Sequence, residues 1–122
     1  MATFKTSIPA SVSSAKWTDT AASSGEVEVS NASITVHQVR IVNTANATKL
    51  YLKLYNLTTA SLTVGTNAPD AILPVEASSS VEYAFDPGIA FGTALSYAVV
   101  SNAGTGGTSA PGTAITIELL TS

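Results

Sequence analysis

Apolar and polar residues alternate in short runs along most of this chain, and clusters of Gly, Pro, Asn and Ser separate the runs. Alternation with a period of two is typical of β-strands with one buried face. The pattern predicts eight strands and no helix longer than one or two turns. The predicted strands are Thr3–Ile8, Glu26–Ser30, Ser33–Asn43, Lys49–Leu57, Ala71–Val75, Ser80–Phe85, Ala94–Ser101 and Ala114–Thr121.

The alternation also predicts which face of each strand is buried. Successive side chains of a strand point to opposite faces, so the run Lys49–Leu57 divides into a leucine face and a tyrosine–lysine face. We expect the leucine face to line the core. The inward residues are Leu50, Leu52 and Leu54, and the outward residues are Tyr51, Lys53 and Tyr55.

Turn-forming residues divide the strands. Asp86-Pro87-Gly88 predicts a tight turn, because proline fixes φ and glycine tolerates a positive φ. The glycine-rich stretch Asn102–Gly112 predicts an exposed loop. The small, hydroxylated stretch Ser11–Gly25 contains Trp17, which we expect to anchor it to the core or to a neighbouring molecule.

One domain is expected from 122 residues. The strand pattern assigns residues 25–122 to a β-sandwich domain and residues 1–24 to an N-terminal arm and linker. Roughly eight strands in a chain of this size fit an antiparallel sandwich. We expect an all-β, jelly-roll-like topology, with an immunoglobulin-like sandwich as the alternative.

Charge and composition narrow the class of partner. Charged residues make up 11% of the chain, so much of the surface has to be polar through hydroxyls and amides, which suits protein contacts. A net charge of -3 and five dispersed cations argue against nucleic-acid binding. No apolar stretch reaches the roughly 18 residues of a membrane span, and the opening residues lack a secretory signal. We therefore expect synthesis in the cytoplasm and no membrane partner.

Residues that could support catalysis are few. The chain has no cysteine and one histidine, His37, which excludes thiolate chemistry and sites built from several histidines. His37 lies within a predicted strand and is interpreted as a strand-face residue. Glu26 and Glu28 could form a carboxylate pair, but the flanking Val27 and Val29 favour the solvated face of an amphipathic strand. We predict no enzyme activity, no cofactor and no metal.

The order of motifs from Val39 onward resembles a known family. Val39-Arg-Ile-Val-Asn43 precedes Leu50-Tyr-Leu-Lys-Leu-Tyr-Asn56, Thr63-Val-Gly-Thr66, Pro69, Phe85 through Gly88-Ile-Ala-Phe91, and Leu95-Ser-Tyr-Ala98. Over residues 33–121 this order resembles the small β-sandwich decoration (cement) proteins of tailed-phage capsids. The resemblance implies a virion structural protein on the capsid exterior, made in the host cytoplasm. It also implies that the protein bridges subunits of the major capsid protein as a homotrimer.

Three parts of the chain are candidate protein contacts. The alternation in Thr3–Ile8 would let an N-terminal arm add a strand to an exposed sheet edge. The outward row on Lys49–Leu57 would offer rigid aromatic area, unless the monomer itself covers that face. The candidate residues are Phe4, Thr6, Ile8, Trp17, Tyr51, Lys53 and Tyr55.

The alternative function is a glycan- or receptor-binding module of a head fibre or tail.

Overall fold

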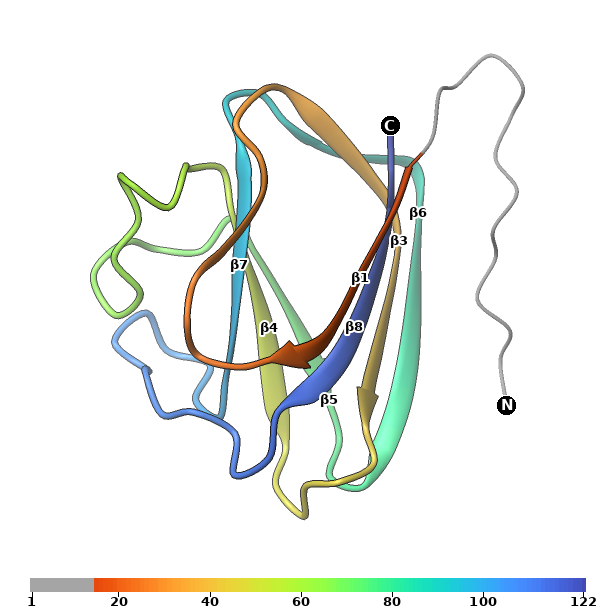
Figure 1. Cartoon of the computed structure of the whole chain (residues 1–122), viewed down its shortest axis with the longest axis vertical. Coiled ribbons are helices and arrows are strands. Elements are labelled where there is room, and N and C mark those ends of the chain that lie inside the picture. The colour runs from red at the N-terminus through yellow and green to blue at the C-terminus, as the bar shows by residue number, and fades with distance from the viewer. Residues whose placement is uncertain (1–14) are drawn as a thin grey trace.

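The computed structural model describes residues 15–122, which form two antiparallel four-stranded sheets and contain no helix (Figure 1). The strands are β1 (Ala15–Ala22), β2 (Val27–Ser30), β3 (Ile34–Asn43), β4 (Leu50–Tyr55), β5 (Ala71–Val75), β6 (Ser79–Phe91), β7 (Leu95–Val100) and β8 (Ile115–Thr121). The prediction of an all-β antiparallel sandwich is confirmed. The predicted strand Thr3–Ile8 lies outside the described residues.

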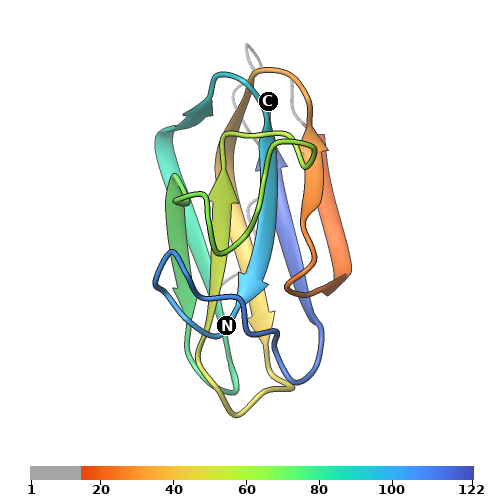
Figure 2. The same ribbon diagram turned by 90° about the vertical axis from the view of Figure 1, so that its left-hand side faces the viewer.

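The strand order is that of a jelly roll. Sheet A has the order β1-β8-β3-β6 and sheet B the order β2-β7-β4-β5. The first strand therefore pairs with the last, the second with the seventh, the third with the sixth and the fourth with the fifth, always antiparallel. Such nested pairs arise when one long hairpin is rolled into two layers, so the immunoglobulin-like alternative is excluded. Figure 2 shows sheet B in front of sheet A.

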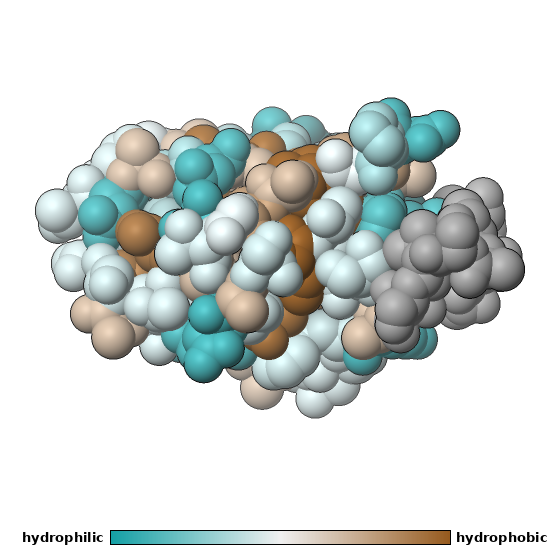
Figure 3. Space-filling view, turned by 90° about the horizontal axis from the view of Figure 1, so that it is seen from above, coloured by the Kyte–Doolittle hydropathy of each residue, from teal (hydrophilic) through white to brown (hydrophobic). Residues whose placement is uncertain are grey.

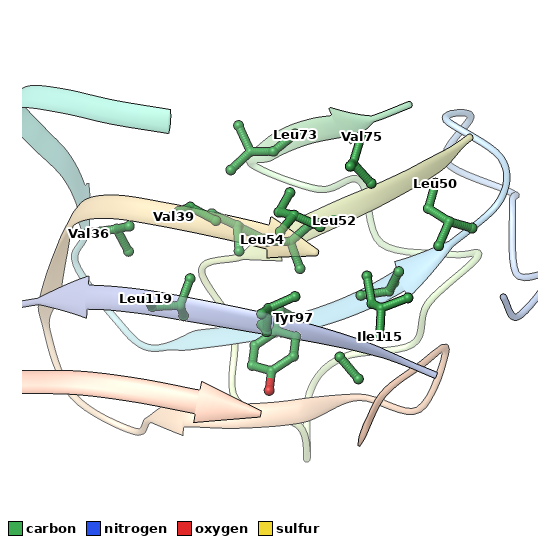
Figure 4. Close-up of a cluster of buried hydrophobic side chains, with 14 of the residues drawn as sticks. Val36, Val39, Leu50, Leu52, Leu54, Leu73, Val75, Tyr97, Ile115 and Leu119 are labelled. Carbon is green, nitrogen blue, oxygen red and sulfur yellow. The ribbon is translucent and has the colours of Figure 1, made fainter. Parts of the chain in front are cut away.

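The core fills the space between the two sheets (Figure 4). The leucine face of β4 lies there as predicted, with Leu50, Leu52 and Leu54 at most 1% exposed. Viewed from above, apolar side chains form a band between the layers (Figure 3). Removing this apolar surface from water stabilises the fold by about 25 cal/mol per Å².

The predicted turn at Asp86-Pro87-Gly88 is instead an irregularity inside β6. Ala84 pairs with Gln38 and Ile89 with Val36, so residues 85–88 form an insertion in β6 opposite His37 of β3. The Asp86–Pro87 peptide bond is cis. Gly88 has a φ of 117°, in agreement with the expectation that this glycine tolerates a positive φ. The turn prediction was wrong because β6 resumes its pairing with β3 after the insertion. The strand predicted as Ser80–Phe85 is therefore only the first half of β6.

The boundary predicted between linker and sandwich was also wrong. Residues 15–22, which we assigned to the linker, form β1 at the edge of sheet A. β1 pairs with β8 from Ala15, which lies opposite Thr121, to Ala22, which lies opposite Ile115. The sandwich therefore includes residues 15–22, which precede the predicted boundary at residue 25.

Candidate protein-contact surfaces

The candidate contacts of the N-terminal arm remain predictions. Phe4, Thr6 and Ile8 lie outside the residues that the structure describes. The other four candidates, Trp17, Tyr51, Lys53 and Tyr55, all lie on strands of the sandwich.

Trp17 anchors β1 to the core, one of the two roles expected for it. Its side chain packs against the buried apolar cluster, and its Nε1–H donates to the Tyr97 hydroxyl at 3.0 Å. The Tyr97 hydroxyl in turn donates to the carboxylate of Asp19. Tyr97 is fully buried among apolar side chains, from which its hydroxyl points away (Figure 4). Burial, and secondly the bond to Asp19, raise the pKa of Tyr97. These contacts hold the edge strand of sheet A to β7 of sheet B.

The predicted outward row on β4 is not an exposed contact surface. Lys53 and Tyr55 are 0% exposed, and Tyr51 is partly buried. The expectation of a solvent-facing row is therefore corrected for Lys53 and Tyr55. Cover within the monomer, which the sequence left open as the alternative, is what the structure shows for these two side chains.

Two loops form a roof over the outer face of sheet B. We use the term roof for residues 56–70 and 101–112 together. The two loops meet where Gly65 faces Thr108, since a Cβ at Gly65 would lie 2.6 Å from Thr108 Cγ2. Leu62 of the first loop is only 5% exposed. The glycine-rich stretch predicted to be an exposed loop thus covers part of the sheet, although most of its own residues are exposed.

Lys53 fixes the second loop of the roof. Its Nζ donates to Gly104 O at 2.6 Å and to Gly107 O at 3.3 Å. The close packing leaves no room at Gly107, where a Cβ would lie 2.7 Å from Asn102 O. Burial lowers the pKa of Lys53, because the ammonium is removed from water and carbonyl dipoles only partly replace its hydration.

Two carboxylates, Glu28 in β2 and Glu26 just before it, hold the first loop of the roof, residues 56–70. Glu28 accepts from the backbone N–H of Thr59 at 2.9 Å, and Glu26 from that of Val64 at 3.2 Å. Glu28 is partly buried, whereas Glu26 is exposed. The interpretation of this pair as simply a solvated strand face is therefore corrected. Both carboxylates hold the roof, and the flanking valines pack on the core as expected.

The outer face of sheet A carries a row of charges of alternating sign. Lys16 of β1 contacts Glu118 of β8 at 2.7 Å, and Glu118 contacts Arg40 of β3 at 3.0 Å. Arg40 is 3.9 Å from Glu82 of β6. Hydrogen bonding to Lys16, and secondly to Arg40, lowers the pKa of Glu118 against the opposing effect of burial. The signs therefore run plus, minus, plus, minus from one edge of the sheet to the other.

The edges of the two sheets differ in their capacity to accept another strand. In sheet B, β2 has four residues and an irregular register, and β5 contains Pro74, which has no N–H to donate. The Tyr83 hydroxyl also donates to Pro74 O. In sheet A, no strand within residues 15–122 pairs with the outer edge of β1 or β6. Both edges of sheet B are thus blocked, whereas neither edge of sheet A is paired within residues 15–122.

Within residues 15–122, the candidate residues for catalysis or metal binding do not come together in one site. His37 lies in β3, as expected for a strand-face residue, with Nε2 2.7 Å from Ser122 Oγ. No group of three or more His, Cys, Asp or Glu residues suited to a metal ion occurs in residues 15–122. No helix in that same range is long and apolar enough to cross a membrane.

Comparison with known proteins gives no match: no protein-family model, no curated protein and no solved structure is significantly similar to this chain.

Proposed function

We propose that this chain is a structural protein of a phage virion that decorates the capsid exterior. In this role it binds the major capsid protein, bridges neighbouring subunits and stabilises the shell as a homotrimer. The proposal rests on the order of sequence motifs that resembles capsid cement proteins. It assigns the protein no catalytic reaction, no cofactor and no nucleic-acid or membrane partner.

The observation that supports this proposal most strongly is the difference between the two sheets. Sheet B is covered by its roof and has blocked edges, as described above. Within residues 15–122, sheet A has two edges without a neighbouring strand and an outer face whose charges are paired with one another. A domain whose sheet B is covered by loops and whose sheet A presents a charged outer face is suited to binding a partner through sheet A. Jelly rolls also occur in viral capsid and lectin domains, which is an analogy of fold alone.

The N-terminal arm would add a second contact. The alternation of Phe4, Thr6 and Ile8 suits pairing with a strand edge of the shell. Deletion of residues 1–10 should lower the occupancy of the protein on purified capsids, measured by quantitative gel densitometry. Unchanged occupancy would remove the arm from the proposal and leave the sandwich as the contact.

The first test is the number of copies per particle. Purified virions are resolved on a denaturing gel, and this band is compared with that of the major shell protein. A ratio near one, or a simple fraction of it, is expected for a protein that follows the capsid lattice. A handful of copies together with binding on a glycan array would replace the proposal with a receptor-binding module. Absence from the particle would refute both.

A further inference from the structure

Sheet A carries opposite charges at its two edges, neither of which pairs with another strand of residues 15–122. The row described above begins with Lys16 on β1 and finishes with Glu82 on β6, and its signs alternate without interruption. Glu82 Oε1 lies 3.9 Å from Arg40 Nε, and the Glu82 side chain is 21% exposed. The β6 end of the row is therefore negative and the β1 end positive.

The two edges also match in backbone geometry. β1 keeps a continuous register from Ala15 to Asp19, and β6 keeps one from Ser79 to Ala84. Neither stretch contains proline or glycine. Because all neighbours in sheet A are antiparallel, β1 and β6 run in opposite directions. A second copy could thus place its β1 beside β6 and continue the same antiparallel pattern.

We infer that copies of this chain associate edge to edge, with β6 of one copy pairing antiparallel with β1 of the next and Glu82 facing the Lys16 of that next copy. This alignment uses the two regular stretches and places Ser80 opposite Thr18. Directly opposed residues of an antiparallel pair lie on the same sheet face, so an ion pair between Glu82 and Lys16 would extend the charge row from copy to copy.

The contact is head to tail, since it joins two different edges. Such contacts form a closed ring when the rotation between copies closes, and an open filament otherwise. This inference rests on the proposed function, in which the protein is a homotrimer. It identifies that homotrimer as a closed ring of three copies joined through these edges. Both edges of sheet A would be paired in the ring, which removes the template for uncontrolled strand addition.

Engineered disulfides test the pairing directly. The chain has no cysteine, so Thr18→Cys with Ser80→Cys introduces the only two thiols and leaves both charges in place. Within one copy these positions lie three strand spacings apart, about 14 Å, which is too far for a disulfide. We expect oxidation of the purified protein to give covalent dimers and trimers on a non-reducing gel. Two controls should stay monomeric: Thr18→Cys with Ala84→Cys, which is out of register, and Thr18→Cys with Ile72→Cys on sheet B.

Charge reversal tests the ion pair. Glu82→Lys alone and Lys16→Glu alone should each be monomeric by light scattering, because like charges then meet at every junction. Mixing the two variants should restore association as heterodimers, because a junction between unlike variants joins opposite charges, whereas a ring of three would always keep one junction of like charges. Circular dichroism of each variant verifies that it is folded.

The inference would be overturned by absence of cross-linking in the folded cysteine pair, by full association of the single charge variants, or by failure of the mixture to associate. If the intact protein is monomeric but a variant lacking residues 1–10 associates, the chain's own N-terminal segment occupies the edge, and the inference is wrong. All of these measurements use purified protein without capsids. A lattice-like copy number with a monomeric pure protein would therefore reject this interface and the homotrimer, and would keep the role in capsid decoration.

Discussion

Tyr97 crosses the sandwich from sheet B and accepts a hydrogen bond from Trp17 Nε1 of sheet A at 3.0 Å. The same hydroxyl donates to Asp19, so one buried group serves two partners on the edge strand β1. β1 has few large apolar side chains, and its attachment therefore depends on this polar contact together with the Trp17 ring.

Loss of the Tyr97 hydroxyl should destabilise the fold. Tyr97→Phe removes the acceptor of Trp17 and the donor to Asp19, which leaves both groups without a buried partner. We expect the free energy of unfolding to fall by about 1–3 kcal/mol, measured by urea denaturation. Exposure of the indole should also shift its fluorescence emission to longer wavelength.

Tyr55→Phe is the matched control, with the opposite expectation. The Tyr55 hydroxyl is buried, and no residue in the range 15–122 forms a hydrogen bond with it. Its removal relieves the cost of burying an unpaired polar group. The stability should be unchanged or increased, and a loss as large as that of Tyr97→Phe would show that the Tyr55 hydroxyl has a stabilising partner.

Lys53→Met should loosen the second roof loop. The substitution removes the donor to Gly104 O and Gly107 O while keeping a side chain of similar length. We expect faster amide hydrogen exchange across residues 101–112, including Gly107, whose N–H donates to Gly104 O. Lys49→Met, which alters a half-exposed lysine outside the roof, should leave exchange in this loop unchanged.

The pH dependence of stability should also change in Lys53→Met. Because burial lowers the pKa of Lys53, the unfolded chain holds this proton more tightly than the folded chain. The free energy of unfolding of the original protein therefore gains a contribution as the pH rises from the folded pKa towards 10.5. The difference in stability between the two proteins, measured between pH 7 and 10.5, isolates this contribution from the tyrosines. A constant difference would mean that Lys53 is solvated.

Glu118→Gln should destabilise the protein at neutral pH and have little effect in acid. The pKa of Glu118 is lowered in the folded state, so its contribution is present above the unfolded value near 4.5 and is lost as the pH falls. We expect a loss of about 1–2 kcal/mol at pH 7, measured by denaturation. The two proteins should converge as the pH decreases below 4.5. Glu76→Gln, at an exposed pair with Lys49, should change stability little.

Gly88→Ala should be strongly destabilising and Gly92→Ala nearly neutral. Gly88 has a φ of 117°, and a Cβ there would lie 2.7 Å from Thr35 Cγ2 and 3.1 Å from Val36 O. A Cβ at Gly92 would have nothing within 4 Å. Thermal unfolding should show a lower midpoint for Gly88→Ala only, corresponding to a loss of about 1–3 kcal/mol. Equal midpoints would show that the β6 insertion adjusts to a side chain.

The positions of the strands from β2 onward were largely predictable, because each has an alternating face. β1 was missed since Ala15–Ala22 has mostly small or polar residues, and only Trp17 and Ala22 contact the core cluster. From its sequence alone β1 resembles a linker, and only its pairing with β8 identifies it as a strand. The single tryptophan was the one local signal of an anchored segment.

The roof could not be predicted from the faces of β4. Alternation identifies the side opposite the core, but it does not indicate whether loops remote in sequence return to cover that side. A signal was present in Leu62, a large apolar residue between Ser61 and Thr63. Its side chain is 5% exposed. The β6 insertion was missed for a similar reason, since Asp86-Pro87-Gly88 suits a turn and a bulge equally well, and only the distant β3 decides between them.

The nested winding of the jelly roll also has a mechanical consequence. Ala15 lies opposite Thr121, so the two ends of the described chain meet at one end of the β1–β8 pair. Antiparallel hydrogen bonds lie across the strands, so tension applied through these two ends would open the bonds one after another instead of shearing them together. The sandwich is therefore expected to resist little force when it is pulled at Ala15 and Thr121. If it reinforces a larger structure, the stress has to pass through its sheets and their edges.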